Sequence, residues 1–300
     1  MLPFKLVFHP KFTVDLGPHV FPAHKYRLVC ERLLETGVAT EADFVAPSPA
    51  TEEDARRVHT SEYLRKIESG DFTSIETQTL EVPWSRSLVE AFFHAAGGAI
   101  LAGRLARRDR CAILIGGGFH HAYPDHGEGF CLLHDVAIAA AALRASRELV
   151  RIAIVDLDVH QGNGTGAILG GDKDTFTVSL HQTHNYPAQK PANSIDVGLE
   201  DGTRDDAYLA ALEEPLRQAL AFRPDLLFYL AGADPYEHDM LGGLGLTLSG
   251  LAERDRRVFE AARAAAVPIA VTLAGGYAAE PADTVRIHAN TVTVAAEVFG

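Results

Sequence analysis

The chain has 300 residues, 47% hydrophobic and 22% charged, which is enough apolar material for a substantial core. Its formal net charge of −13 at pH 7 argues against broad binding to nucleic acid. The first residues, "MLPFKLVFHP", lack the basic start and long apolar core of a signal peptide, and there is no apolar run of about 18 residues and no CxxC pair among the three cysteines. We therefore expect a cytoplasmic protein with reduced thiols and no membrane span.

Short apolar runs alternate with longer stretches rich in Ala, Leu and Arg along the chain. The runs predict strands at 5–8, 111–115, 151–157, 175–180, 225–231 and 268–274. The longer stretches predict helices over 24–36, 52–68, 84–108, 135–148, 205–222, 249–265 and 284–298. This alternation is typical of a mainly parallel sheet with helices on both faces. No change in composition divides the chain, so we expect one doubly wound α/β domain over residues 1–300.

Five polar clusters begin where predicted strands end. They are "GGGFHH" (116–121), "DLDVHQGNG" (156–164), "SLHQTHNYP" (179–187), "AGADP" (231–235) and "AGGY" (274–277). In open α/β sheets, ligands bind at the carboxyl ends of the strands. The convergence of five clusters on this edge predicts a functional site there.

The second cluster places Asp156, Asp158 and His160 at alternate positions, which a regular strand would turn to one face. Asp and His suit a borderline divalent metal, and a catalytic zinc ion typically keeps three protein ligands and an open position. Asp158 and His160 can supply two ligands, and Asp234, at the end of another apolar strand, is the best candidate for the third. Taken alone, the motif equally fits a solvated strand end.

His120 and His121 are adjacent, and we expect their side chains to diverge in an extended loop. Two imidazoles near a metal then suggest proton transfer rather than joint chelation. Each needs a partner on its far ring nitrogen, and Asp156 and Asn163 remain for this role. The hydroxyl of Tyr277 can stabilise negative charge on a carbonyl oxygen, although a "GGY" triplet alone is more often a packing tyrosine.

Together these motifs resemble the zinc-dependent histone deacetylase family of the arginase–deacetylase superfamily. The matching pieces, in the family's order, are "GGGFHHA", "GFCLLHDVAIA", "IVDLDVHQGNGT", "VSLH", "AGADP", "GGLGLTLSGL" and "LAGGY". Two further pieces, "FPAHKYRLV" and "VHTSEYL", extend the resemblance to nearly the whole chain. The "HQGNG", "FPAHKYRLV" and "MLGGLGLTLSGL" pieces are more similar to class IV than to class I, and the short length suggests a prokaryotic relative.

The resemblance implies the arginase–deacetylase fold and two kinds of bound cation. Asp158, His160 and Asp234 would hold one Zn²⁺ per chain, although the sequence does not distinguish Zn²⁺ from Fe²⁺. A structural K⁺ would lie beside it, partly on backbone oxygens, at the positions that match Asp156, Asp158, His160, Ser179 and Leu180.

The resemblance also implies catalytic roles. His120 and His121 would be tandem general acid–base histidines, with Asp156 as the partner of His120. Asn163 stands where many relatives have aspartate, so the partner of His121 is neutral, which should leave its imidazolium less stabilised. Tyr277 would polarise the substrate carbonyl.

For the substrate channel, the resemblance places Gly129 and Phe130 along an acyl-lysine channel, with Tyr186 as the opposite wall. His134 replaces the asparagine that is usual in this motif, and no role follows for it.

We therefore expect hydrolysis of Nε-acyl-lysine amides in a protein or peptide. The class IV likeness implies a preference for long fatty acyl groups, and the small residues of "AILIGGG" and "AGAD" would allow a cavity beyond the metal. One alternative is an amidohydrolase acting on acetylpolyamines or other small acylated amines. Another is a binuclear manganese ureohydrolase of the arginase type, which would need more aspartates than "GADPYEHD" provides. A zinc-containing acyl-lysine binding protein without turnover is the non-enzymatic alternative.

Overall fold

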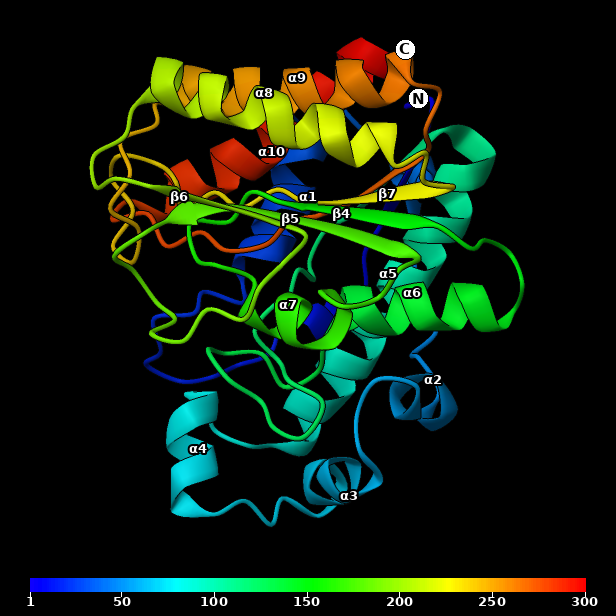
Figure 1. The fold of residues 1–300 in the computed structure, drawn as a ribbon, viewed down its shortest axis with the longest axis vertical. Helices are drawn as coiled ribbons and strands as arrows, with labels where there is room; N and C mark the ends of the chain where they lie inside the picture. The colour runs from blue at the N-terminus through cyan, green and yellow to red at the C-terminus, as the bar shows by residue number, and fades with distance from the viewer.

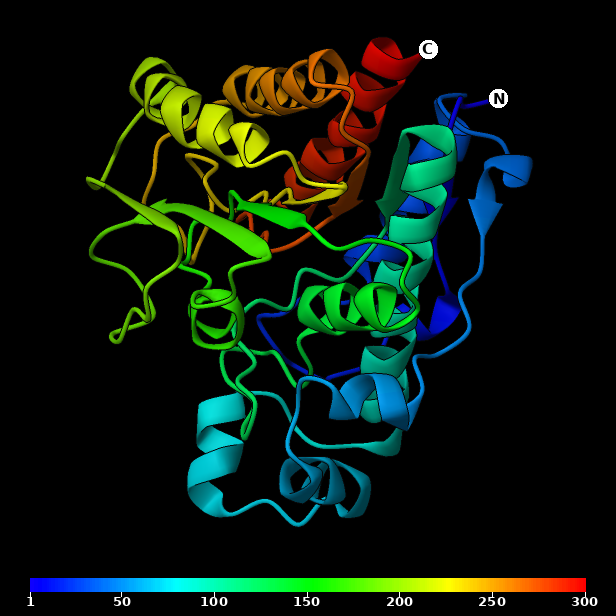
Figure 2. The same cartoon turned by 45° about the vertical axis from the view of Figure 1, so that its right-hand side comes forward.

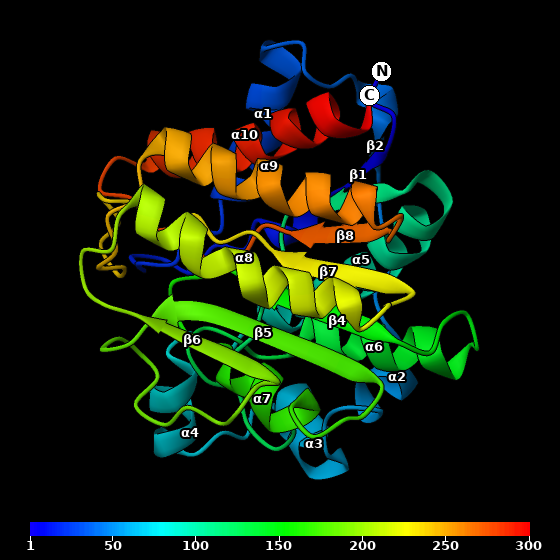
Figure 3. The ribbon, with the colours of Figure 1, turned by 45° about the horizontal axis from the view of Figure 1, so that its top comes forward.

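A computed structural model describes residues 1–300, and its centre is one eight-stranded sheet. The strands are β1 (Lys5–Val7), β2 (Phe44–Val45), β3 (Cys111–Leu114), β4 (Ile152–Asp156), β5 (Thr175–Gln182), β6 (Ile195–Leu199), β7 (Leu226–Leu230) and β8 (Ile269–Thr272). Their order across the sheet is β2-β1-β3-β8-β7-β4-β5-β6, and every neighbouring pair is parallel (Figure 3). The carboxyl ends of all eight strands therefore lie along one edge.

Helices cover both faces of the sheet, as the doubly wound prediction requires (Figure 1). One layer contains α1 (Lys25–Glu35), α8 (Asp205–Ala221), α9 (Leu248–Ala264) and α10 (Pro281–Phe299). The opposite layer contains α5 (Arg86–Asp109), α6 (Asp135–Ala145) and α7 (Asn163–Leu169). Beyond that second layer, away from the sheet, lie the short helices α2 (Glu52–Arg56), α3 (Ser61–Ser69) and α4 (Ser74–Leu80) (Figure 2). The predicted fold class is confirmed.

All six predicted strands are present, because strands covered on both faces consist of continuous apolar residues. Two strands were not predicted: β2 has only two residues, and β6 is a half-exposed edge strand. The single helix expected over 52–68 is wrong. The chain forms α2 and α3 there, because Thr60 caps a new helix by accepting the N–H of Tyr63 at 3.2 Å.

By length and composition alone, the helix α5 could cross a membrane. In the fold, 78% of its apolar 18-residue stretch is buried. Its glycines allow close packing: a Cβ at Gly97 would lie 2.0 Å from the carbonyl oxygen of Ser48, and one at Gly103 would lie 2.7 Å from Leu143 of α6. α5 is therefore a core helix that packs against the protein itself.

Candidate active site

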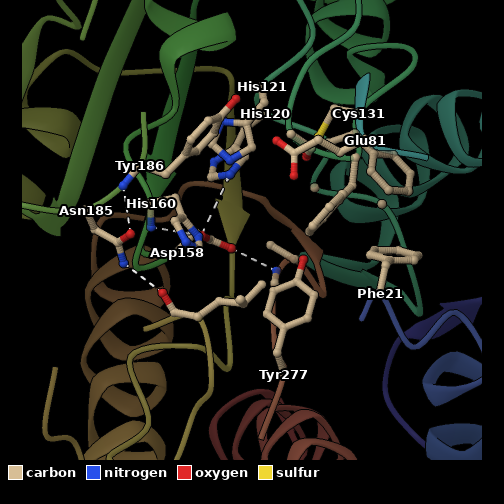
Figure 4. A pocket seen from close by; sticks show the side chains of 18 of the residues that line it. Phe21, Glu81, His120, His121, Cys131, Asp158, His160, Asn185, Tyr186 and Tyr277 are labelled. Carbon is tan, nitrogen blue, oxygen red and sulfur yellow. Dashed lines mark hydrogen bonds and ion pairs between the residues drawn. The ribbon is translucent and has the colours of Figure 1, made fainter. Parts of the chain in front are cut away.

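A cavity of about 200 Å³ opens at the carboxyl edge of the sheet (Figure 4). The segments that follow β3, β4, β5 and β8 contribute to its wall. Phe21, which precedes α1, and Glu81, which follows α4, complete one side of it. The predicted convergence of strand-end clusters therefore produces a single cavity.

Asp158 and His160 line this cavity, the fully buried Asp234 lies beside them, and the three form what we call the metal cluster. One possible ligand atom of each residue lies within 4.8 Å of the others. His160 Nδ1 is 3.1 Å from Asp158 Oδ1 and 3.5 Å from Asp234 Oδ2. All three side chains are buried, so their charges are poorly solvated.

The electrostatics of the metal cluster fit a divalent cation. Asp234 Oδ1 accepts the N–H of Val159 at 2.9 Å, but the buried Oδ2 has no hydrogen-bond partner. Burial and the nearby charge of Asp158 raise the pKa of Asp234 to about 7. A cation between the carboxylates would satisfy the orphaned oxygen and offset the repulsion. Two carboxylates and one imidazole are also a donor set that zinc accepts.

The sequence suggested that a regular strand turns Asp156, Asp158 and His160 to one face. The structure shows a different arrangement. β4 ends at Asp156, and Asp158 and His160 follow in an irregular segment. Hydrogen bonds from the backbone fix this segment instead: Asp156 Oδ1 accepts the N–H of Asp158 at 3.1 Å, and Asp158 Oδ1 accepts the N–H of His160 at 3.0 Å. The acidic side chains thus organise the backbone that carries them.

A buried arginine supports the two ligand-bearing segments from behind. Arg254 is paired with Asp255 at 2.8 Å and has no exposed surface. Its guanidinium donates to the carbonyl oxygens of Gly232 at 2.6 Å and Leu157 at 3.3 Å. Leu157 directly precedes Asp158, and Gly232 lies two residues before Asp234, so Arg254 couples the ends of β4 and β7.

The expectation that His120 and His121 diverge is wrong, since their ring centroids are 4.0 Å apart. The preceding glycines have φ angles of 147°, 75° and 77°, so this segment is not extended. Both predicted partners are in place: His120 Nδ1 lies 2.6 Å from Asp156 Oδ2, and His121 Nδ1 lies 2.6 Å from Asn163 Oδ1. Both histidines line the cavity.

The two partners give the histidines different electrostatics. Burial disfavours the charge of His120, but the carboxylates of Asp156 and Asp158 outweigh it and raise its pKa to about 9. Burial holds the pKa of His121 well below its usual value, and the neighbouring His120 lowers it further. The amide of Asn163 opposes this effect only weakly, so His121 is the neutral member of the pair.

Tyr277 lies in the loop after β8, and its hydroxyl oxygen is directed towards the cavity (Figure 4). Two residues that the sequence reasoning missed anchor this loop. Asp239 Oδ2 accepts the N–H of Tyr277 at 2.6 Å. The buried Lys25 Nζ donates to the carbonyl oxygens of Ala274 at 3.0 Å and Gly276 at 3.4 Å. Lys25 belongs to the "FPAHKYRLV" piece, which was the only signal for it.

Gly129 and Phe130 line the cavity from a tight turn. Their φ angles are 51° and 69°, as in a type I′ turn. Two backbone hydrogen bonds close the turn. The N–H of Cys131 donates to the carbonyl oxygen of Glu128 at 2.9 Å, and the N–H of Glu128 donates to the carbonyl oxygen of Cys131 at 3.1 Å. The turn thus places Phe130 in the wall of the cavity.

Tyr186 also lines the cavity and lies against the Gly129 end of this turn, where an added Cβ would be 3.0 Å from its ring. Its ring centroid is 5.0 Å from that of His121. The sequence analysis did not single out several other residues of the wall: Phe21, Glu81, Asn185 and Leu241. Phe21, Asn185 and Leu241 lie in pieces that the sequence analysis quoted, whereas Glu81 carried no recognisable pattern.

The residues expected at a K⁺ site meet at the same edge. Ser179 is directly opposite Asp156 in the β4–β5 pairing, and Leu180 follows it. The hydroxyl of Ser179 lies 3.4 Å from the N–H of Gly162 and 3.1 Å from His181 Nδ1.

His134, for which the sequence suggested no role, supports the layer beneath the site. Its Nδ1 accepts the N–H of Ala137 at 3.2 Å and so caps α6. Its Nε2 lies 3.0 Å from the hydroxyl of Thr165 in α7, and its backbone N–H donates to His59 at 3.1 Å. His134 therefore joins α6 to α7 and does not face the cavity.

The sequence profile described as the histone deacetylase domain matches residues 19–293. The chain belongs to the histone deacetylase family. An uncharacterized protein of Picosynechococcus sp. is 38% identical to this family member over 298 residues, 99% of each chain. Histone deacetylase 2 of Arabidopsis thaliana is 34% identical over 269 residues, 86% of this chain and 70% of the relative. The crystal structure of the HDA15 HD domain superposes with a TM-score of 0.80 at 25% identity, over 98% of this chain and 88% of that one.

Membership in the histone deacetylase family settles the class of activity. The predicted family and the arginase–deacetylase fold are confirmed, and the chain is a hydrolase of the deacetylase and amidohydrolase type. This result decides against the ureohydrolase of the arginase type and against a binding protein without turnover.

Proposed function

We propose that this histone deacetylase family member hydrolyses Nε-acyl-lysine amides in proteins or peptides. The observation that carries the proposal is the meeting of the metal cluster, two hydrogen-bonded histidines and one tyrosine hydroxyl around a single cavity. A metal site, a proton acceptor and an oxyanion donor are the groups that amide hydrolysis requires.

The metal cluster would hold one Zn²⁺. When bound, such an ion supplies Lewis-acid polarisation of the acyl carbonyl and of water. We also propose a structural K⁺ bound by Asp156, Ser179 and Leu180, together with backbone oxygens of Asp158 and His160. Its support is the direct pairing of Asp156 with Ser179 in neighbouring strands.

The two histidines divide the proton transfers. The Nδ1 of His121 faces Asn163, which leaves its Nε2 to take a proton from the attacking water. His120 is paired with the carboxylate of Asp156, which favours its protonated form, so we assign it the delivery of a proton to the departing amine. The neutral partner Asn163 thus makes His121 the base. The charged partner Asp156 makes His120 the acid.

Tyr277 supplies a hydrogen bond to the oxygen that becomes negatively charged. Burial, with the charge of Asp158, holds the pKa of Tyr277 well above its usual value, so the hydroxyl keeps its proton. A donor fixed before the reaction stabilises the transition state without the cost of reorganisation.

The cavities do not support the expected preference for a long acyl chain. A Cβ at Gly117 would lie 2.4 Å from Asp135 Oδ2, and one at Gly118 would lie 2.6 Å from the Cβ of Ala274. These glycines therefore serve a tight turn and close packing. The adjacent apolar cavity, which shares Phe119 and Phe130 with the main one, holds about 20 Å³. That is room for roughly one water molecule. We propose acetyl and similarly short acyl groups as the preferred substrates.

Acetylated polyamines are a second candidate because of Glu81. This carboxylate lines the cavity, and burial together with the charge of Glu128 raises its pKa. A second ammonium group on the substrate would offset the repulsion between the carboxylates of Glu81 and Glu128. A lysine peptide without a nearby cation would not.

A turnover panel with the zinc-loaded protein tests the proposal. kcat/KM is measured for acetyl-, octanoyl- and myristoyl-lysine in one peptide, with acetylated polyamines alongside. We expect acetyl-lysine to be the fastest acyl-lysine and the rate to fall with chain length. A faster acetylpolyamine would favour the second candidate. Failure to hydrolyse any acylated amine would refute the proposal.

A further inference from the structure

Asn163 is a neutral partner for His121, but a carboxylate lies directly behind it. The amide Nδ2 of Asn163 donates to Glu128 Oε1 at 2.7 Å, on the side opposite His121. The hydroxyl of Tyr186 donates to the same oxygen at 2.5 Å. A continuous hydrogen-bonded chain therefore runs from His121 through Asn163 to Glu128.

The hydrogen bonds from His121 through Asn163 to Glu128 determine which way the amide of Asn163 points. An ionised carboxylate only accepts hydrogen bonds, so Glu128 requires the NH₂ group of Asn163 on its side. A flipped amide would place Oδ1 against the carboxylate, where it would lose a hydrogen bond and add repulsion between two acceptors. The carbonyl oxygen of Asn163 must therefore face His121.

The orientation of the amide in turn selects the tautomer of His121. Because Oδ1 of Asn163 can only accept, the neutral imidazole must carry its proton on Nδ1. The lone pair then resides on Nε2, the ring nitrogen that makes no hydrogen bond to Asn163. The His121 side chain that carries it lines the cavity. A general base needs this tautomer, since the opposite one presents an N–H to the substrate.

Glu128 is itself held in place and ionised. It opens the type I′ turn whose tip lines the cavity, and its side chain is 18% exposed. His126 Nε2 lies 3.4 Å from the second carboxylate oxygen. Burial raises the pKa of Glu128, but hydrogen bonds from His126, Tyr186 and Asn163 outweigh it, so the net pKa is below its ordinary value.

We propose that Glu128 is a positioning residue for the reaction: it orients the amide of Asn163 and thereby keeps the proton of His121 on Nδ1. The role of the tautomer in turnover rests on the proposed function. The tautomer itself can be measured without any substrate.

Two substitutions separate hydrogen-bond acceptance from packing. Glu128→Gln keeps an oxygen that can accept from Asn163, whereas Glu128→Met fills similar space without a strong acceptor. The ¹⁵N shifts of histidine-labelled, zinc-loaded protein report the tautomer of His121, whose signals are assigned by their loss in His121→Phe. We expect wild type and Glu128→Gln to carry the proton on Nδ1. Glu128→Met should show both tautomers, with kcat reduced roughly tenfold or more and KM less affected, because a misplaced tautomer can cost up to about 10⁴ in kcat.

Asp125→Asn is the matched control, because the side chain of Asp125 lies in the same loop, is 70% exposed and pairs with His126, not with Asn163 or Glu128. It should leave both the tautomer and kcat unchanged. Retention of the pure Nδ1–H tautomer in Glu128→Met would overturn the proposal, and so would a loss in Glu128→Gln as large as that in Glu128→Met. If the protein hydrolyses no acylated amine, the proposed function fails, but the ¹⁵N comparison still decides the role of Glu128.

Discussion

Replacing Tyr277 with phenylalanine removes a single oxygen atom from the site. The ring keeps its neighbours, since its centroid lies 6.0 Å from that of Phe130 and 5.3 Å from Lys25 Nζ. The loop keeps its anchor, because Asp239 binds the backbone N–H and not the hydroxyl. No protein atom hydrogen-bonds the hydroxyl, so the free energy of unfolding should change by less than about 1 kcal/mol.

The expected effect on catalysis is much larger. Deleting one oxyanion donor costs about 2.7–4 kcal/mol in the transition state, which corresponds to a loss of roughly 10²–10³ in kcat. The metal content should not change, since Tyr277 does not belong to the metal cluster.

The assay measures kcat and KM on an acetyl-lysine peptide, with metal content and Tm recorded for the same preparation. Tyr236→Phe is the control, since it removes another tyrosine hydroxyl, one that donates to Asp283 at 3.2 Å outside the cavity. A kcat for Tyr277→Phe close to that of wild type would refute the oxyanion role. A raised KM with unchanged kcat would assign the hydroxyl to substrate binding.

Three further predictions concern the metal, packing and pH. Asp234→Asn removes the orphaned carboxylate oxygen of the metal cluster, so elemental analysis should find far less than one metal ion per chain; full retention would exclude Asp234 as a ligand. Gly118→Ala should lower the free energy of unfolding in urea by about 1–3 kcal/mol, because its φ is 77° and the new Cβ would lie 2.6 Å from Ala274. Gly171→Ala, with no atom within 4 Å, should show no such loss, and equal effects would contradict this reasoning. Hydrogen bonds from Lys66 and Thr73 lower the pKa of Glu76 from 4.5 to about 2, so its stabilisation is complete above pH 4.5 and disappears as the pH falls through 2. The advantage of wild type over Glu76→Gln should be at most about 1 kcal/mol at pH 7 and shrink across that window; a constant difference would argue against the Lys66–Glu76 pair.

The sheet and the metal cluster were predictable because their signals are local. A strand buried on both faces is a continuous apolar run, as in Ile152–Asp156, and each functional cluster follows such a run directly. The helix α7 was missed because its sequence, "NGTGAIL", is glycine-rich and resembles a turn. Packing against the site overrides that weak propensity, since a Cβ at Gly164 would lie 2.4 Å from the carbonyl oxygen of Ala122.

The supporting residues could not be predicted because their partners are distant in the sequence. Glu128 is 35 residues from Asn163, Asp239 is 38 residues from Tyr277, and Lys25 is 249 residues from Ala274. Hydrogen bonds of this kind depend on how loops meet in the fold, and no periodicity encodes them. The proximity of the two histidines was missed for a related reason, because the positive φ angles of the preceding glycines bend the chain.

Titration of metal-free protein with Zn²⁺, with release of acetate from an acetyl-lysine peptide as the readout, tests the proposed hydrolase most directly. The three buried ligands of the metal cluster predict that activity rises from the baseline and reaches its plateau at one equivalent of Zn²⁺ per chain. Asp234→Asn, titrated in parallel, should stay at the baseline up to that equivalence point. Full activity without added metal, or a plateau at two equivalents, would contradict the assignment.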